Sequence, residues 1–552
     1  MRSLDLLVAT AIAAVTLTGT GRCQQPQVAL PQQQDNLAAG IGDSSSRHED
    51  EDPYRPSAAH AQRNANHIFN AIHSSMRQWG SSLQHNGLSF FPASIPAGTL
   101  LYHGDGSRDP PPAREWLAFE IEHAMMFAKH RPTAPGKSST SSSSRVDVAA
   151  RLGVVDASSE QGSEPGAGAG AATEAAKWDP GYLQIFRATR ALDRVLYFDG
   201  SSAGNSPFGM MDTQDLVFLN KSRPPLDDLN RADDLCKLGA EWNIEAFIRM
   251  EAGFELIKCN FTDGLQLLSA RRTPNVSDLT AYDDRFLFNY MRSVAMRHEG
   301  IGANRVVLDY SSMVSSLFYN TNLTNPAPAR ANYDTSLPRI LHTEPEQLYR
   351  IRSDLEKVFA RERSFQSTVD WQGVVDMIVT RYSERLQIMA GGLPGNQLLA
   401  EINTLLNLFV DYGETGVSED ESVAACSYHY LQPMNLACFT EQDHMIFAAI
   451  EQVTKEICGT LFGVRRVLLK SQGGKNAMSA VASIRELNAW LNWTTWQFCG
   501  HCRPDQVCFV AAWPYGLEED HYEPKCRSNE EMRKRHHQFP NYWFPDELPE
   551  LA

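Results

Sequence analysis

The sequence predicts an α+β protein, with a mixed sheet region followed by a mainly helical half and a disulfide-stapled C-terminal tail. Short apolar runs separated by glycine- and proline-rich turns between residues 98 and 220 are typical of strands. Beyond residue 343, apolar side chains recur at three- and four-residue steps, as in amphipathic helices. The last part of the chain concentrates cysteine and tryptophan, which indicates a small stapled unit.

Length, composition and charge limit the classes of function. The chain of 552 residues is long enough for two or three cores, and its 42% hydrophobic and 21% charged residues are ordinary for a globular protein. The formal net charge is -16, and the longest basic run is RKRHH at residues 533–537. A nucleic acid partner would need a basic stripe, so we exclude nucleic acid, and the acidic balance also disfavours anionic membranes.

Residues 1–23 have the pattern of a secretory signal peptide. Arg2 precedes an apolar run over residues 4–17, and small residues follow. We expect cleavage before Gln24, and therefore a secreted, extracellular protein. The alternative is a membrane anchor, but the run is shorter than the roughly 20 residues that span a bilayer. No later segment is long and apolar enough, so we expect no membrane span after signal cleavage.

Secretion decides how the ten cysteines are interpreted. If Cys23 leaves with the signal peptide, an oxidising compartment favours disulfides among the rest, and the odd count leaves one thiol free or pairing between chains. Cys236 and Cys259 could pair across one helix–strand unit. The alternative for the last four cysteines is a zinc site, which this compartment disfavours, so we predict no metal. The disulfide candidates are Cys236, Cys259, Cys426, Cys438, Cys458, Cys499, Cys502, Cys508 and Cys526.

Asn-x-Ser/Thr sequons permit glycosylation once secretion is accepted. They occur at Asn220, Asn260, Asn275, Asn322 and Asn492. We therefore expect a glycoprotein.

Composition divides the chain into five segments. The first 60 residues end in a Gln-, Pro- and Asp-rich stretch with little to bury, which predicts disorder. Ser, Gly and Ala dominate an internal low-complexity insert. The expected segments are the signal peptide at 1–23, the disordered N-terminus at 24–60, the α+β domain at 61–330 with its insert at 133–176, the helical region at 331–480 and the Cys/Trp-rich tail at 481–552.

Apolar periodicity and turn residues predict the individual elements. In the first half they are a helix at 61–83, a strand at 99–103, a helix at 113–130, strands at 182–187, 194–198 and 215–219, then a helix, a turn at Gly239 and a strand ending at Cys259. In the second half a capping box, Thr343 with Glu346, begins a helix to 359, and further helices follow at 371–389, 398–412, 443–458 and 475–490. We expect the tail to pack on the body as a lid.

No strong catalytic motif is present. The sequence has no GxSxG elbow, no HExxH, no Walker loop and no clear GxGxxG after a strand. These absences count against serine hydrolases, zincins and nucleotide triphosphatases.

Polar groups at the predicted strand ends form a first candidate site. A histidine beside Gly104 at a strand end lets a ligand approach the backbone and offers a tunable donor. Glu120 and His123 lie three apart on one helical face, which suits a metal pair or an acid/base pair, although we prefer a solvated surface pair. The catalytic candidates are His103, Glu120 and Asp215, and the substrate-binding candidates are Tyr102, Gly104, Phe127 and Asp199.

The motif GTLLYHG, followed by a helix ending H-A-x-x-F-A and by paired strands, resembles the opening of ADP-ribosyltransferase folds. The resemblance covers residues 98–220 and implies that His103 and Gly104 hold a nicotinamide dinucleotide. Residues 127–128 match the helix end, and residues 214–215 would replace the acidic residue that orients the ribose for attack at its anomeric carbon. A Ser-Thr-Ser strand is missing. NAD would then be a substrate, and the cofactor is otherwise unknown.

Taken whole, the chain resembles an uncharacterised family of large secreted proteins of filamentous fungi. The stretches that carry this resemblance are EWLAFEIEHAMMFA, LYFDGSSAG, AFIRMEAGFELIKCNF and WLNWTTWQFCGHC. It covers most of residues 95–545. It implies a secreted fungal protein of shared architecture, and no reaction.

A second candidate cluster is Arg249, Glu251 and Glu255 in FIRMEAGFEL. We prefer a buried ion pair, because buried charge must be compensated. The alternative is a glycosidase pair of carboxylates, which the tail tryptophans could assist by stacking on sugars. Those tryptophans are more simply explained as core.

Two classes of function follow. The first is a secreted enzyme of unassigned activity with a site around His103, for which ADP-ribosyl transfer is the most specific hypothesis. The second is a carbohydrate-active enzyme, or a glycan- or wall-binding protein without catalysis. A purely binding role predicts that loss of Trp493 or Trp496 destroys function while loss of His103 does not. The expected ligand is a small molecule or a glycan.

Overall fold

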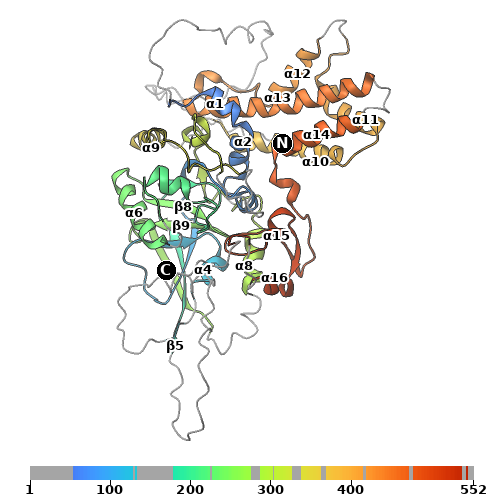
Figure 1. The fold of residues 1–552 in the computed structure, drawn as a ribbon. Helices are drawn as coiled ribbons and strands as arrows, with labels where there is room; N and C mark the ends of the chain where they lie inside the picture. The colour runs from blue at the N-terminus through green and yellow to red at the C-terminus, as the bar shows by residue number, and fades with distance from the viewer. Residues whose placement is uncertain are drawn as a thin grey trace, which may run out of the picture.

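The computed structural model describes residues 54–128, 131–132, 178–223, 227–274, 286–302, 304–325, 337–361, 369–413, 418–470, 477–536 and 542–544. The predicted signal peptide, most of the predicted disordered N-terminus, the insert at 133–176 and Asn275 lie outside the described residues. The described chain is α+β, as predicted. Figure 1 shows a sheet-containing half and a half of long helices that extends away from it.

A ten-stranded sheet forms the first half. Only β7 and β8 pair in parallel among its strands, with α6 (Asp228–Glu241) as the crossover between them, and the other neighbours are antiparallel. The sheet is therefore mixed, as predicted. Its order is β10 (Leu265–Arg272), β6 (Tyr182–Ala188), β2 (Leu100–Asp105), β3 (Glu115–Ala118), β9 (Phe254–Lys258), β8 (Ala246–Met250), β7 (Leu192–Phe198), β1 (Ser89–Ile95) and β11 (Val307–Leu308), with β12 (Val314–Ser315) also on β1.

The central strands β8 and β9 are buried along their whole length. Their sequences AFIRM and FELIK do not alternate cleanly between apolar and polar residues, because both faces of the sheet are covered. In the antiparallel register Arg249 lies directly opposite Glu255. The fold thus forces this charged pair into the interior.

Three predicted elements have a different structure. The helix expected at 61–83 is three helices, α1 (Ala58–Arg63), α2 (Ala65–Ser74) and α3 (Gln78–Leu83), and Met76 with φ of 54° turns the chain before the last. The helix expected at 113–130 is the strand β3 followed by α4 (Ile121–Met125). The strand expected at 215–219 is wrong, because Thr213–Phe218 form one turn of π-helix.

The second half is mainly helical, as predicted. The capping box expected at Thr343 is absent, since the Thr343 hydroxyl donates to the Asn322 carbonyl and Pro345 begins the helix instead. The long helices are α9 (Pro345–Ala360), α10 (Trp371–Ala390), α11 (Gly395–Leu406), α12 (Glu419–Tyr428), α13 (Glu441–Lys470) and α14 (Ala477–Leu491). The remaining helices of more than one turn are α8 (Phe286–Ala295), α15 (Glu518–Tyr522) and α16 (Asn529–His536).

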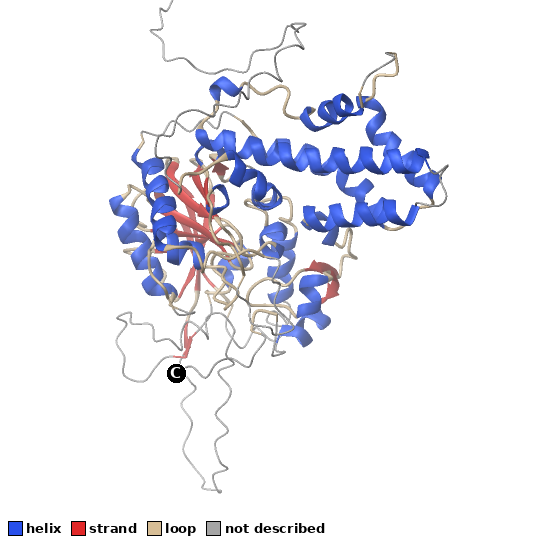
Figure 2. Ribbon diagram, turned by 45° about the horizontal axis from the view of Figure 1, so that its top comes forward, coloured by secondary structure: helices blue, strands red, loops and turns tan. Residues whose placement is uncertain are grey.

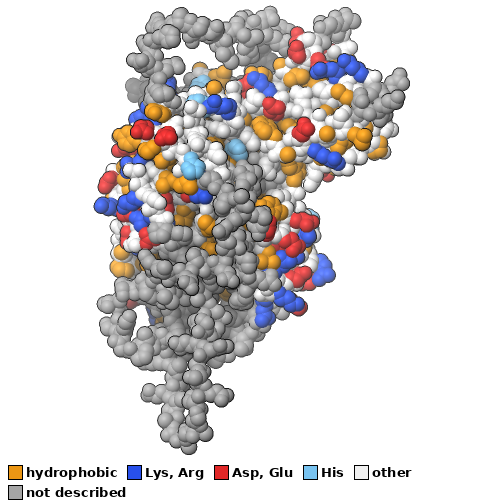
Figure 3. Space-filling view, viewed as in Figure 1, with side chains coloured by type: hydrophobic (Ala, Val, Ile, Leu, Met, Phe, Trp, Pro, Cys, Tyr) orange, Lys and Arg blue, Asp and Glu red, His pale blue; other side chains and the backbone are white. Residues whose placement is uncertain are grey.

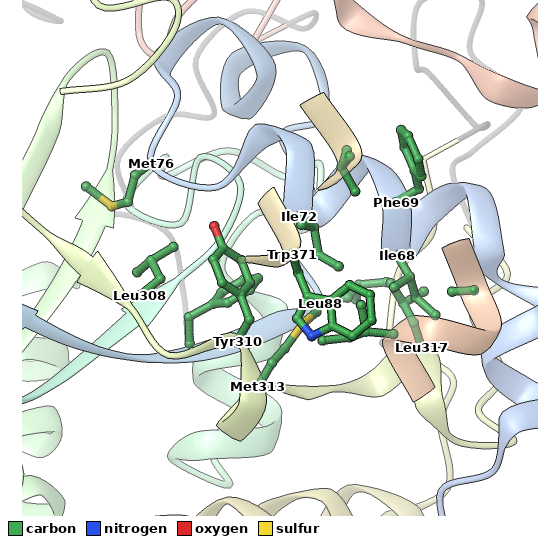
Figure 4. Close-up of a cluster of buried hydrophobic side chains, with 14 of the residues drawn as sticks. Ile68, Phe69, Ile72, Met76, Leu88, Leu308, Tyr310, Met313, Leu317 and Trp371 are labelled. Atoms are coloured by element: carbon green, nitrogen blue, oxygen red, sulfur yellow. The ribbon is translucent and has the colours of Figure 1, made fainter. Parts of the chain in front are cut away.

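One hydrophobic core runs through the sheet and the helical half. Figure 4 shows Ile68 and Ile72 of α2 beside Leu88, Met313 and the first residue of α10, Trp371. The buried Trp371 indole donates to the Asp443 carboxylate at 2.8 Å, which ties α10 to the first turn of α13. Figure 2 shows helices on both sides of the sheet, with the long helices extending away from one side. The two halves therefore share apolar packing.

Disulfides staple the tail, as predicted. The bonds between described cysteines are Cys236–Cys259, Cys426–Cys458, Cys499–Cys508 and Cys502–Cys526, and Cys438 is disulfide-bonded as well. The first confirms the predicted pairing and ties α6 to the end of β9. The zinc alternative fails, because the sulfur atoms of the last four cysteines are bonded to one another in pairs. None of the described cysteines is free, so the unpaired thiol expected from the odd count is not found among them.

Three of the tail tryptophans are core residues. Trp493, Trp513 and Trp543 are buried. Trp513 and Trp543 pack with Phe208 and Met210. The tail also contains an antiparallel pair of strands, β13 (Gln506–Phe509) and β14 (Lys525–Ser528). These three rings are therefore not available as a sugar-stacking surface.

The surface carries charges of both signs. On the face seen in Figure 3, Lys and Arg side chains lie among Asp and Glu. Among the described residues, no helix has both the length and the apolar character needed to cross a membrane.

Candidate functional site

A pocket of about 120 Å³ lies over four adjacent strands, β2, β3, β9 and β8, and is closed by α4 and by the start of α6. A volume of this size holds one small molecule or one ring of a larger one. The pocket contains His103 together with Arg249, Glu251 and Glu255. The structure thus brings the two candidate clusters from the sequence into one site.

His103 reaches the pocket from β2 with a defined tautomer. Its Nδ1 lies 2.7 Å from the carbonyl oxygen of Trp116, and a carbonyl can only accept, so Nδ1 carries the hydrogen. The ring is 6% exposed, and its Nε2 has no hydrogen-bond partner. Nε2 of neutral His103 is therefore a buried acceptor, open to a proton from a ligand or from water.

His123 and Glu251 form a short buried pair. Nε2 of His123 lies 2.6 Å from Oε1 of Glu251, and both side chains are almost fully buried. Burial acts to lower the pKa of His123, but the hydrogen bond to Glu251 and the charges of Glu251 and Glu255 together raise it. Tyr290 packs against the imidazole with ring centroids 5.2 Å apart. The pair holds one proton between a histidine and a carboxylate.

A buried network of charges supports the pocket floor. Arg249 binds Glu255 at 2.6 Å and contacts Asp228 at 3.4 Å, while Arg231 binds Asp228 and Asp215 at 2.9 Å. Burial raises the pKa of Glu255, and the charge of Arg249 opposes this rise. Both guanidinium groups are fully engaged by carboxylates. Neither is left to bind an anion.

Four predicted site residues line the pocket: Tyr102, His103, Gly104 and Phe127. Gly104 was expected to let a ligand approach the backbone, but the structure shows a different role for this glycine. A Cβ atom there would lie 2.0 Å from the Ala124 carbonyl oxygen and 2.7 Å from the Ala128 nitrogen. The missing side chain therefore lets α4 pack on β2, instead of admitting a ligand to the backbone.

The other three predicted residues lie outside the pocket. The Glu120 carboxylate binds Arg305 at 2.9 Å and Arg297 at 3.4 Å, so it does not pair with His123. Glu120 caps α4 and is not part of its helical face, which is why the expected spacing fails. Asp215 supports the floor through Arg231. Asp199 lies beside a separate cavity of about 30 Å³.

Asp199 is buried and accepts a hydrogen bond from the Ser89 amide at 2.8 Å. Burial raises its pKa from 3.8 to about 7. The folded state therefore binds this proton more tightly than the unfolded state, and the stability that it contributes falls as pH rises from about 4 to about 7. We expect Asp199→Asn to gain stability relative to wild type between pH 5 and pH 8. Thermal unfolding of the variant and of wild type at the two pH values measures this gain, and the exposed Asp193→Asn is the control. A stability difference between Asp199→Asn and wild type that is the same at both pH values would contradict the prediction.

Sequence reasoning missed several pocket residues. Asp228 lies in the acidic run DDLNRADD, and no sequence pattern distinguishes it from the other acidic residues as the one that contacts two arginines. Asp105 ends β2, and Glu115 begins β3, where a helix was predicted instead of a strand. His123 was noted for its spacing from Glu120, while its true partner, Glu251, lies 128 residues away.

Residues 59–286 match the family model of the YPL277C N-terminal domain, and the pocket lies within this span. The chain is similar to uncharacterised yeast proteins. It is 27% identical to the uncharacterised protein YOR389W of Saccharomyces cerevisiae over 83% of each chain. It is 28% identical to the uncharacterised protein YPL277C of the same yeast, over 59% of this chain and 74% of the relative. No solved structure matches.

These similarities agree with the expectation of an uncharacterised family. Both relatives come from a yeast, and both are named as uncharacterised proteins. The match to residues 59–286 covers the pocket and the strands of the sheet other than β11 and β12, but not the helical half.

Proposed function

We propose that the protein is an enzyme that breaks or transfers a glycosidic bond in this pocket, on a substrate without phosphate. The observation that carries the proposal is the presence of three groups in one small pocket: the His123–Glu251 pair, and His103 with its open Nε2. Hydrolysis at an anomeric carbon needs one group that gives a proton and one that takes a proton. Aromatic side chains of Tyr102, Trp116 and Phe127 line the same space.

The roles follow from where the protons are. The bond between the anomeric carbon and the leaving oxygen breaks, and Glu251 passes the proton that it shares with His123 to that oxygen. Water adds its OH to the carbon and gives its proton to Nε2 of His103. Loss of that proton to solvent and uptake of one by the His123–Glu251 pair restore the resting state, so the overall reaction consumes one water.

Charge favours a substrate without phosphate over a dinucleotide. Among the described residues lining the pocket, Arg249 is the only Lys or Arg, and Glu255 and Asp228 already engage it. A pyrophosphate would meet no free cation and five carboxylates there. ADP-ribosyl transfer also acts at an anomeric carbon, so the same groups would serve it, and NAD belongs in the test as a competing substrate.

Turnover of a panel of chromogenic aryl glycosides, with NAD hydrolysis measured in parallel, tests the proposal. We expect kcat/KM of Glu251→Gln to fall by about 10²- to 10⁴-fold, the usual contribution of a general acid. The control is Glu122→Gln, which lies on α4 beside a different cavity and should leave kcat/KM unchanged. No turnover of any glycoside, or turnover indifferent to Glu251→Gln, would overturn it. NAD cleavage that is lost in Glu251→Gln would establish ADP-ribosyl chemistry instead.

We also propose that the protein is secreted and glycosylated. Disulfides favour an oxidising compartment, and Asn220, Asn260, Asn322 and Asn492 are all exposed. Mass spectrometry of the protein recovered from culture medium, before and after enzymatic removal of N-glycans, tests both points. A protein found only in the cell pellet would contradict them.

A further inference from the structure

The mouth of the pocket differs from its floor in how its charges are paired. On the floor, Arg249 and His123 each have a carboxylate partner. At the half-exposed mouth, Asp105 and Glu115 have no Lys, Arg or His within salt-bridge distance among the described residues. The Trp116 amide donates a hydrogen bond to Oε1 of Glu115 at 3.3 Å. Two uncompensated carboxylates therefore face the space that a ligand must enter.

Their placement in the sheet makes this arrangement costly without a partner. Asp105 is the last residue of β2 and Glu115 the first of β3. The two strands pair antiparallel at Tyr102–Ala118, and both carboxylates lie three residues from that pair, at the same end of the two strands. Two like charges that line one pocket without a counter-charge repel each other. A cation between them would remove this repulsion.

The neighbouring groups indicate which kind of cation fits this place. Trp116, next to Glu115, lines the pocket, and an indole ring attracts ammonium groups. The Arg114 guanidinium stacks over the same ring at 5.0 Å, but its charge is already bound by Asp233 at 2.5 Å. Deeper in the pocket, the buried Nε2 of His103 has no partner and is open to accept a hydrogen bond. The site thus places hydrogen-bond acceptors at two depths: two carboxylates at the mouth and Nε2 of His103 below them.

We propose that the sugar bound in this pocket carries a protonated amine, held at the mouth by Asp105 and Glu115, so that the substrate is an amino-sugar glycoside. This inference rests on the proposed glycosidic function. The amine lies at the mouth between the two carboxylates, and the same ring lies against His103, whose Nε2 accepts from the attacking water. An acetylated amine carries no charge, so it would leave the two carboxylates without a counter-charge.

Isothermal titration calorimetry at pH 6 with a glucosamine disaccharide and with its N-acetylated counterpart tests the inference. We expect the charged disaccharide to bind at least tenfold more tightly, and its affinity to fall with added salt. The double variant Asp105→Asn/Glu115→Gln should lose this preference. Because the double variant removes a repulsion, it should unfold at the same temperature as wild type or higher. Such a result would exclude misfolding as the cause of the lost preference. Glu122→Gln is the matched control.

Binding and turnover separate the two proposals. Tight binding of the charged disaccharide without hydrolysis would defeat the proposed reaction and leave the amine site standing. Hydrolysis of glycosides with equal affinity for the charged and acetylated forms would defeat the amine site and leave the reaction standing. A preference that survives in the double variant, or calcium or magnesium ions that displace the disaccharide from wild type, would also overturn the amine site.

Discussion

Replacing Arg249 by methionine should lower the free energy of unfolding by about 3 to 5 kcal/mol, the usual cost of removing one member of a buried ion pair. Arg249 is 1% exposed and lies directly across the β8–β9 ladder from Glu255. Without it, Glu255 and Asp228 would lose a counter-charge in the interior. The cost comes from the unpaired carboxylates, since methionine fills most of the same volume.

A second substitution isolates that cause. In Arg249→Met/Glu255→Leu the buried carboxylate opposite Arg249 is gone as well, so we expect most of the lost stability to return. Urea unfolding followed by circular dichroism measures both variants. Arg466→Met, which breaks the exposed contact with Glu419, is the control and should change little. If Arg249→Met alone proves as stable as wild type, the network does not support the pocket floor.

Local sequence patterns predicted the types of most elements but not how the sheet is ordered. AFIRM and FELIK carried enough apolar and β-branched residues to indicate strand, yet the turn between them has only Gly253 as a marker, so the hairpin was read as one strand. The run DLVFL has the composition of a strand. It nevertheless forms a π-helix, in which Asp215 binds Arg231, an interaction that no local pattern contains.

The site was found in two unconnected pieces. His103 and Glu251 are 148 positions apart, and no periodicity places them together. The sequence nevertheless indicated each piece. His103 stands at the end of an apolar strand, and Glu251 and Glu255 are carboxylates in an apolar segment, where charged groups usually have a partner or a function. The pairing of His123 was mispredicted, since helical spacing was applied to Glu120, which precedes the helix. Only the order β2-β3-β9-β8 in the sheet explains why the pieces meet.

Replacing Trp493 by alanine should lower the free energy of unfolding by about 3 to 5 kcal/mol, as for other large aromatic rings deleted from a core. Trp493 is 2% exposed and stacks on Phe69 of α2, with ring centroids 5.6 Å apart. Nearby, Asn66 and Asn70 donate to the carbonyls that end α14. The ring therefore joins the first helices of the chain to the last long helix.

The same measurement separates the two classes of function that the sequence left open. If the tail tryptophans bound a glycan, Trp493→Ala would abolish binding and leave stability intact, and Trp493→Phe would behave in the same way. The buried position predicts the opposite: Trp493→Ala loses stability, Trp493→Phe recovers much of it, and ligand affinity persists in both while they are folded. His103→Asn should show the converse, with nearly unchanged thermal stability because Nε2 has no protein partner, and with ligand binding lost. Loss of glycan binding in Trp493→Phe at wild-type stability would return the ligand site to the tail and remove the pocket from consideration.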